Sequence, residues 1–263
     1  MGNYLRHLVV LSSIALKCRK FWLVAAASGL CLVPLSLGLS EPALAQTCSP
    51  VANPGSFTAA QSSTVCTGTF NTNINFGGPN TPPPSLLILE LQQGAVSVNS
   101  PGGNAVNLQN TFGPASGVSA TIIANDATIT NTSMPALDSQ SALRIVAAGN
   151  ATINASGIIN MTGGQSTNAI FSTVFTSVGG SVASVTYDGP ATGPGITATG
   201  GPNSTLIQAC ANDGCGYGSS ADANVIINAG GNLTGIGPQN APPAIGNGIG
   251  GLFAASGGNG DAT

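Results

Sequence analysis

The stretch Ala151-Thr-Ile-Asn-Ala-Ser-Gly157 decides the fold, because the chain repeats it. It is echoed by Ala183-Ser-Val-Thr-Tyr-Asp-Gly189 and Ala223-Asn-Val-Ile-Ile-Asn-Ala-Gly230, and Asn125-Asp-Ala-Thr-Ile-Thr-Asn131 has the same form. Each stretch alternates apolar and polar residues between Gly, Asn or Asp. This pattern is typical of a short strand bounded by turns.

The repeat also predicts which residues share a face. Because side chains alternate along a strand, Ile153, Val185 and Val225 are expected at equivalent inward positions. The residues two positions earlier should point the same way, and those between should face outward. The expected inward set is Ala151, Ala183 and Ala223, and the outward set is Thr152, Ser184 and Asn224.

Two further short stretches follow each copy of the repeat. The second set is Ile158–Thr162, Ile196–Thr199 and Leu233–Thr234, and the third is Asn168–Phe171, Thr205–Gln208 and Gly251–Ala254. Strands this short become stable only when stacked on a shared core. We therefore expect an all-β fold, a parallel β-solenoid (β-helix) that follows an N-terminal helical signal sequence. The repeated Ile/Val alternation argues against the alternative, a disordered Gly-rich linker.

The N-terminal region has the order of a secretion signal. Basic residues lie in the first twenty positions, the apolar run Phe21–Leu39 follows, and Ala43-Leu-Ala45 supplies a small-x-small cleavage site. We expect cleavage between Ala45 and Gln46; an uncleaved membrane anchor is the alternative. The predicted organisation is a signal peptide of extended type at 1–45, an N-terminal cap and first coils at 46–117, and solenoid repeats at 118–263, truncated at the C-terminus.

The long leader and the Gly-rich repeats together resemble the passenger domains of autotransporters, the type V secreted proteins. The similarity lies in Ala223–Gly237, in Gly250–Ser256, and in Ala142–Val146 leading into Ala151–Gly157. It implies an N-terminal passenger fragment, exported and displayed at the cell surface or released, as an adhesin or structural spacer. It also implies an outer-membrane barrel in a full-length form, which this sequence lacks, so a periplasmic location is the alternative.

Four cysteines remain beyond the leader: Cys48, Cys66, Cys210 and Cys215. An even number in an oxidising compartment favours disulfides. Of the three possible pairings, Cys48–Cys66 with Cys210–Cys215 closes the shortest loops and costs least in chain entropy. Metal binding is the rival interpretation, but beyond residue 45 there is no histidine or C-x-x-C to support it.

The charge distribution limits the chemistry. Only 5% of the 263 residues are charged, against about 25% in an ordinary soluble domain. Beyond residue 45 one arginine, Arg144, faces seven acids, giving a net charge of −6. Without His or Lys there, a Ser-His-Asp triad, a Cys-His pair and a Schiff-base lysine are all excluded. One arginine and a negative charge also argue against nucleic-acid binding.

Paired carboxylates are the remaining catalytic option, as in glycosidases. The candidates are Asp126 with Asp138 or Asp188. Asp213 and Asp222 suggest calcium, but the G-G-x-G-x-D repeat that binds it is missing. We expect a non-catalytic protein without cofactor or metal. Its expected partners are the secretion machinery, through the leader, and a host surface, abiotic surface or glycan, through loops; the alternatives are a solenoid remnant without a partner or a carbohydrate-active β-helix enzyme.

Overall fold

A computed structural model describes residues 47–49, 63–77, 85–100, 102–111, 117–132, 140–176, 179–201, 203–212, 222–236, 250–256 and 260–263, with the backbone alone at 47, 49 and 93–95. The predicted signal peptide and its cleavage site, Ala45 and Gln46, lie outside these residues. Asp138, Asp213 and Cys215 lie outside them as well. Among the described residues there is no helix with the length and apolarity that crossing a bilayer requires.

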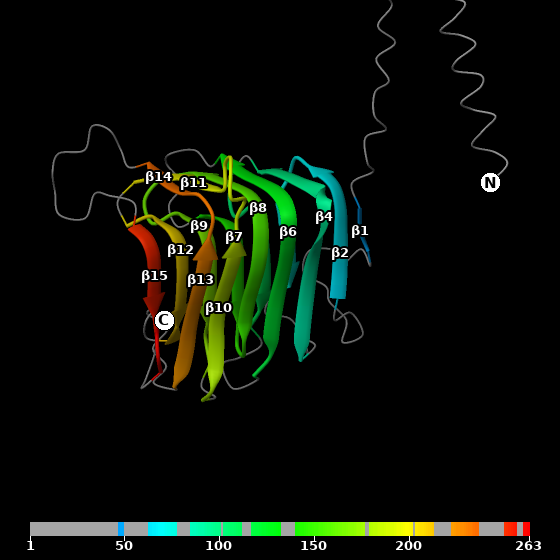
Figure 1. Cartoon of the computed structure of the whole chain (residues 1–263). Helices are drawn as coiled ribbons and strands as arrows, with labels where there is room; N and C mark the ends of the chain where they lie inside the picture. Colours follow the sequence, from blue (N-terminus) through cyan, green and yellow to red (C-terminus); the bar gives the residue numbers. More distant parts are fainter. Residues whose placement is uncertain are drawn as a thin grey trace, which may run out of the picture. The chain divides into compact units, whose positions relative to one another are not determined.

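Most of the described residues belong to strands, which short turns and loops connect (Figure 1). In chain order the strands are β1 Thr47–Ser49, β2 Ser63–Phe70, β3 Ile74–Gly77, β4 Leu86–Ser100, β5 Val106–Asn110, β6 Ser119–Thr132, β7 Ser141–Ala147, β8 Ala151–Thr162, β9 Asn168–Val174, β10 Ser181–Asp188, β11 Ile196–Thr199, β12 Thr205–Ala211, β13 Ala223–Gly230, β14 Leu233–Ile236 and β15 Gly250–Ala255.

The strands belong to two sheets, and the chain alternates between them. The first sheet runs β1-β2-β4-β6-β8-β10-β13, with β11 and β14 joined to it through β8. The second runs β3-β5-β7-β9-β12-β15. Every pairing is parallel except that of β1 with β2. The chain therefore winds as in a β-helix, which confirms the prediction of an all-β parallel solenoid.

The core fills the space between the sheets. Ile122, Ile153 and Val185 follow one another in register on the first sheet, and all three are fully buried. On the second sheet Leu143 and Ile170 stack in the same way. Because each rung repeats an inward aliphatic residue, the apolar core is continuous through the stack, and its burial drives the folding of strands too short to be stable alone.

Buried polar side chains hold the turns between the sheets. Asn131 is fully buried, and its Nδ2 donates to the carbonyl oxygens of Gly103 at 2.6 Å and Ser141 at 3.0 Å. Asn110 Nδ2 donates to the Ser119 carbonyl oxygen at 2.8 Å. These bonds give the buried Asn amides hydrogen-bond partners, without which their burial would be costly, and they tie the turns to the adjoining strands.

The long strand β8 bends at Gly157. Its first part, Ala151–Ser156, pairs with β10, and its last part, Ile159–Thr162, pairs with β11. Gly157 has φ +90°, a conformation that glycine adopts without strain. In the next rung a loop, residues 189–195, takes the place of this bend. Five residues (154–158) separate Ile153 from Ile159, whereas ten (186–195) separate their partners Val185 and Ile196, yet both pairs stay in register.

The predicted register was correct for one pair of repeats and wrong for another. Ala151 and Ile153 pair with Ala183 and Val185, as expected. However, Ala183 pairs with Val225, so Val225 and Ala223 sit two residues away from their expected equivalents. Both are still buried. A shift of two residues preserves the side that each side chain faces, so the alternation alone does not distinguish the two registers.

The stretch Asn125–Asn131, which has the same alternating form, lies beside the second part of β8. Ala127 pairs with Gly157 at the bend, and Ile129 pairs with Ile159 beyond it. The true equivalent of the first part is Ala120–Ala124, in which Ile122 pairs with Ile153. Both segments alternate in the same way because they belong to one bent strand, β6.

Candidate functional site

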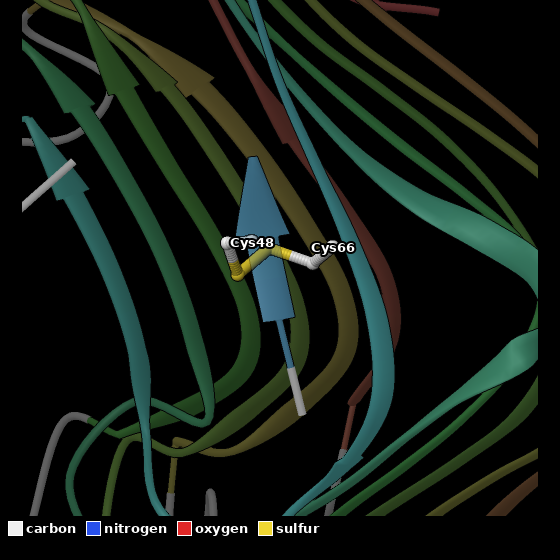
Figure 2. Close-up of a disulfide and its surroundings, with 2 residues drawn as sticks. All are labelled: Cys48 and Cys66. Atoms are coloured by element: carbon white, nitrogen blue, oxygen red, sulfur yellow. A yellow bond between two sulfur atoms is a disulfide. The ribbon is translucent and has the colours of Figure 1, made fainter. Parts of the chain in front are cut away.

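The disulfide between Cys48 and Cys66 is present, as predicted (Figure 2). The two residues face each other across the antiparallel pair of β1 and β2. Cys66 is fully buried, and Cys48 packs against the core. The bond therefore fastens β1 to the outer edge of the first sheet. An antiparallel edge strand also covers backbone groups that would otherwise be open to pairing with another chain.

The second predicted disulfide is only half within the described residues. Cys210 lies fully buried on β12 and is disulfide-bonded. Its sulfur is 3.9 Å from Thr173 Oγ1 on the neighbouring strand β9. The expected partner, Cys215, lies outside the described residues, so the Cys210–Cys215 pairing stays a prediction.

Two of the candidate catalytic acids lie on either side of Ser156 at the bend of the first sheet. The backbone N–H of Asp126 donates to Ser156 Oγ at 2.8 Å, and Ser156 Oγ donates to Asp126 Oδ1 at 3.2 Å. Ser156 pairs in turn with Asp188. Asp126 and Asp188 therefore belong to strands β6 and β10, two strands apart in the sheet, with Ser156 of β8 between them. Both are exposed, and the third candidate, Asp138, lies outside the described residues.

The calcium candidates do not form a described site. Asp222 is exposed just before β13, and Asp213 lies outside the described residues. Within the residues that the structure describes, no three His, Cys, Asp or Glu side chains gather closely enough to hold a metal ion.

The outer face of the second sheet carries a feature that the sequence reasoning missed. On β7, β9 and β12 the side chains are buried on both sides of the strand except at the central position. These central residues are Arg144, Phe171 and Gln208, and they stack in register. Pairing extends the stack to Asn107 on β5 and Phe253 on β15. We refer to these five residues as the outward row.

Contacts within the outward row hold its side chains in place. Arg144 Nη1 donates to Asn107 Oδ1 at 2.8 Å. The guanidinium carbon of Arg144 is 5.9 Å from the centre of the Phe171 ring, within the range of a cation–π interaction. The alignment of amide, cation and aromatic ring follows directly from the parallel register of the strands.

A pocket opens at the end of the outward row. Its volume is about 420 Å³, and its lining residues are Ser166, Asn203, Ser204, Thr205, Gln208, Gly250 and Phe253. Ser166 and Asn203 have positive φ (54° and 60°), and each lies two residues before one of the paired residues Asn168 and Thr205. The same turn is thus repeated in two successive rungs, and it forms the rim of the pocket.

Buried hydroxyl groups form the floor of this pocket. Ser204 and Thr205 are almost fully buried. Ser204 Oγ lies 3.0 Å from Thr167 Oγ1, and Thr205 Oγ1 donates to Asn168 Oδ1 at 2.5 Å. The floor is therefore held rigidly by hydrogen bonds between two rungs. The lining contains no charged side chain, and its one aromatic ring, Phe253, is 44% exposed.

The repeat itself contained the signal that could have located this site. The third set of stretches holds Ile170, Ile207 and Leu252, which pair with one another. Aligning them as inward residues places Phe171, Gln208 and Phe253 in one outward row. The pocket's turns could not be found in this way, because their shape depends on φ values at residues outside the repeat.

No protein-family model, curated protein or solved structure matches this chain.

Proposed function

We propose that this chain is an exported, non-catalytic β-helical passenger, related in type to those of autotransporters, that acts at the cell surface as an adhesin or a structural spacer. The main support is the unbroken parallel ladder from β2 to β13 in the first sheet. A continuous ladder of this kind makes a rigid support, on which outward side chains are held at fixed spacings. The outward row and its pocket are the part of this surface best suited to contact a partner.

The available side chains support a binding role rather than a catalytic one. The chain beyond residue 45 has no histidine or lysine. Asp126 and Asp188 are exposed at a bend, and the described pocket does not include them. A ligand pocket usually combines an apolar or aromatic wall with a few placed polar groups, as the pocket at Gln208 and Phe253 does.

Export is tested by expressing the full chain, leader included, in a host with an outer membrane. The protein should appear beyond the inner membrane, and N-terminal sequencing should return Gln46-Thr-Cys-Ser. The variant Ala43→Arg should block processing, since signal peptidase requires a small residue there. An unprocessed wild-type chain that stays in the cytoplasm would refute the proposal.

An adhesion assay then distinguishes the adhesin role from the spacer role. Beads coated with the exported protein should attach to cultured cells or to glass more strongly than albumin-coated beads if the protein is an adhesin. Exported protein that gives no attachment above albumin identifies a spacer.

A further inference from the structure

We infer that the pocket between Gln208 and Phe253 binds a neutral carbohydrate. This inference rests on the proposed role as a surface passenger and names the ligand class for the site described above. It follows from three properties of the pocket: its lack of charge, its pairing of an amide with an exposed ring, and its rigid floor.

The electrostatics favour an uncharged ligand. None of the seven lining residues is charged. The exported part of the chain carries a net charge of −6, which disfavours an anionic ligand. A cation would find no carboxylate in the lining to replace its hydration shell. A neutral polar molecule is not repelled by the negative net charge, and it does not have to give up the hydration shell of an ion.

The side chains match the two kinds of surface that a sugar presents. Gln208 and Phe253 are register partners on adjacent strands, about 4.8 Å apart along the stack. Phe253 is 44% exposed, and its ring offers apolar surface to the C–H groups of a pyranose. The Gln208 amide, whose Nε2 lies 3.9 Å from Cys210 Sγ, can both donate and accept hydrogen bonds, as sugar hydroxyl groups require.

The pocket is formed before any ligand arrives. The Ser204–Thr167 and Thr205–Asn168 hydrogen bonds hold the floor, and the two turns with positive φ at Ser166 and Asn203 form the rim. A preformed site loses little conformational entropy on binding, which helps a small polar ligand that buries little apolar surface.

The outward row extends the pocket across the sheet. Phe171 lies two rungs from Phe253, about 10 Å away, with Gln208 between them. Phe171 is half-buried and its ring faces the Arg144 guanidinium at 5.9 Å, so it adds a side contact for a linear oligosaccharide lying across the strands, while Phe253 supplies the open ring. We therefore expect an oligosaccharide to bind more tightly than its constituent monosaccharide.

The test uses the exported protein on an immobilised panel of neutral oligosaccharides, with sialylated and uronate-containing ones alongside. Calorimetry then measures the affinity of the best neutral oligosaccharide for the wild type, Phe253→Ala, Gln208→Ala and Thr130→Ala. Thr130 lies half-exposed on the first sheet and serves as the matched control. The two pocket variants should bind about tenfold more weakly or worse, and Thr130→Ala should match the wild type. Circular dichroism should show the same thermal unfolding for all four proteins.

Three results overturn the inference: no binding to any neutral oligosaccharide, binding to acidic sugars alone, or equal affinities for the pocket variants and the wild type. These failures are distinct from failure of the proposed function. Export, N-terminal processing and bead adhesion are measured without any sugar, so they stand or fall separately.

Discussion

Ile153 and Thr152 are neighbours in the chain, but they belong to opposite sides of β8. Ile153 is fully buried between Ile122 and Val185 of the adjoining rungs. Thr152 is half-buried and accepts a hydrogen bond from Ser184 Oγ at 3.1 Å on the outer surface. At the scale of single residues, the solenoid is defined by this difference between adjacent positions.

Substitution of these neighbours by aspartate should therefore have unequal effects. Ile153→Asp places an unpaired carboxylate in the core and should lower the free energy of unfolding by more than about 3 kcal/mol. Thr152→Asp should be nearly neutral, because its carboxylate would lie on the outer surface, partly in water, and could still accept the hydrogen bond from Ser184 Oγ. Urea denaturation followed by circular dichroism, with limited proteolysis, measures both. Equal tolerance of the two variants would contradict the inward position of Ile153.

Tyr187 makes stability depend on alkaline pH. Its hydroxyl group donates to the Gly157 carbonyl oxygen at 2.7 Å, and its side chain is buried. Burial raises the pKa of Tyr187 from 10.0 to about 12, and the nearby Asp188 carboxylate adds to this rise. Above pH 10 the unfolded chain releases the phenolic proton more readily than the folded chain, so the folded state loses stability as pH rises.

This stabilisation should be complete below pH 10 and lost progressively between pH 10 and 12. The expected fall in the free energy of unfolding by pH 12 is about 2 kcal/mol. Denaturation curves for the wild type and Tyr187→Phe, recorded from pH 9 to 12, test it. The difference between the two proteins should shrink with pH; a constant difference would show that Tyr187 does not titrate in this range.

At the scale of elements, the bend of β8 requires glycine for two separate reasons. Gly157 and Gly193 share φ +90°. A Cβ on Gly157 would lie 2.5 Å from the Ala127 carbonyl oxygen of the adjoining rung, whereas a Cβ on Gly193 would meet nothing within 4 Å. A substitution at Gly193 therefore tests backbone strain alone, whereas one at Gly157 tests backbone strain together with close packing.

Gly193→Ala should cost only the strain of an L-residue at positive φ, about 1–2 kcal/mol. Gly157→Ala should cost a further 1–3 kcal/mol or so, because backbone atoms of two rungs must move apart. Thermal or chemical denaturation of both variants provides the comparison. Similar losses in the two variants would mean that the rungs tolerate separation at the bend.

The edge strand β1 depends on its disulfide. The bond joins residues 18 positions apart and should contribute about 3 kcal/mol. Cys48→Ala should therefore lower the free energy of unfolding by about this amount in oxidising buffer, with a much smaller difference from the wild type in reducing buffer. Equal stabilities in oxidising buffer would show that β1 adds nothing to the stack.

The sequence predicted the strand pattern far better than the register in which the strands pair. Alternation correctly placed Ala151, Ile153, Ala183 and Val185 in register and inward. It could not distinguish the pairing of Ala183 with Ala223 from that with Val225, since both keep the same face inward. The pocket at Gln208 and Phe253 was missed because it needs three stacked rungs and the turns between them, which only the tertiary arrangement brings together.

For the whole stack, stability should vary along its length. Each rung contacts only its neighbours, so inner strands are held on two sides and outer ones on fewer. β8 pairs with β6, β10 and β11, whereas β15 pairs with β12 alone among the described strands. Leu252 on β15 is 52% exposed, although its partner Ile207 is fully buried.

Hydrogen exchange should reveal this gradient. Amides of β8 should exchange at least about tenfold more slowly than amides of β15, because local opening at the outer rung disrupts fewer contacts. Mass spectrometry of peptides covering the two strands measures the difference. Uniform protection along the stack would indicate a single cooperative unit rather than a chain of coupled rungs.

The loop between β10 and β11 bears on how such a protein can evolve. Residues 186–195 span a step that five residues complete in β8, yet Val185 and Ile196 remain paired with Ile153 and Ile159. Length at this bend is therefore decoupled from the packing on either side. Insertions and deletions can accumulate there under selection for new surface features, and an epitope tag placed at Gly193, where a side chain would meet open space, should leave the flanking ladder intact.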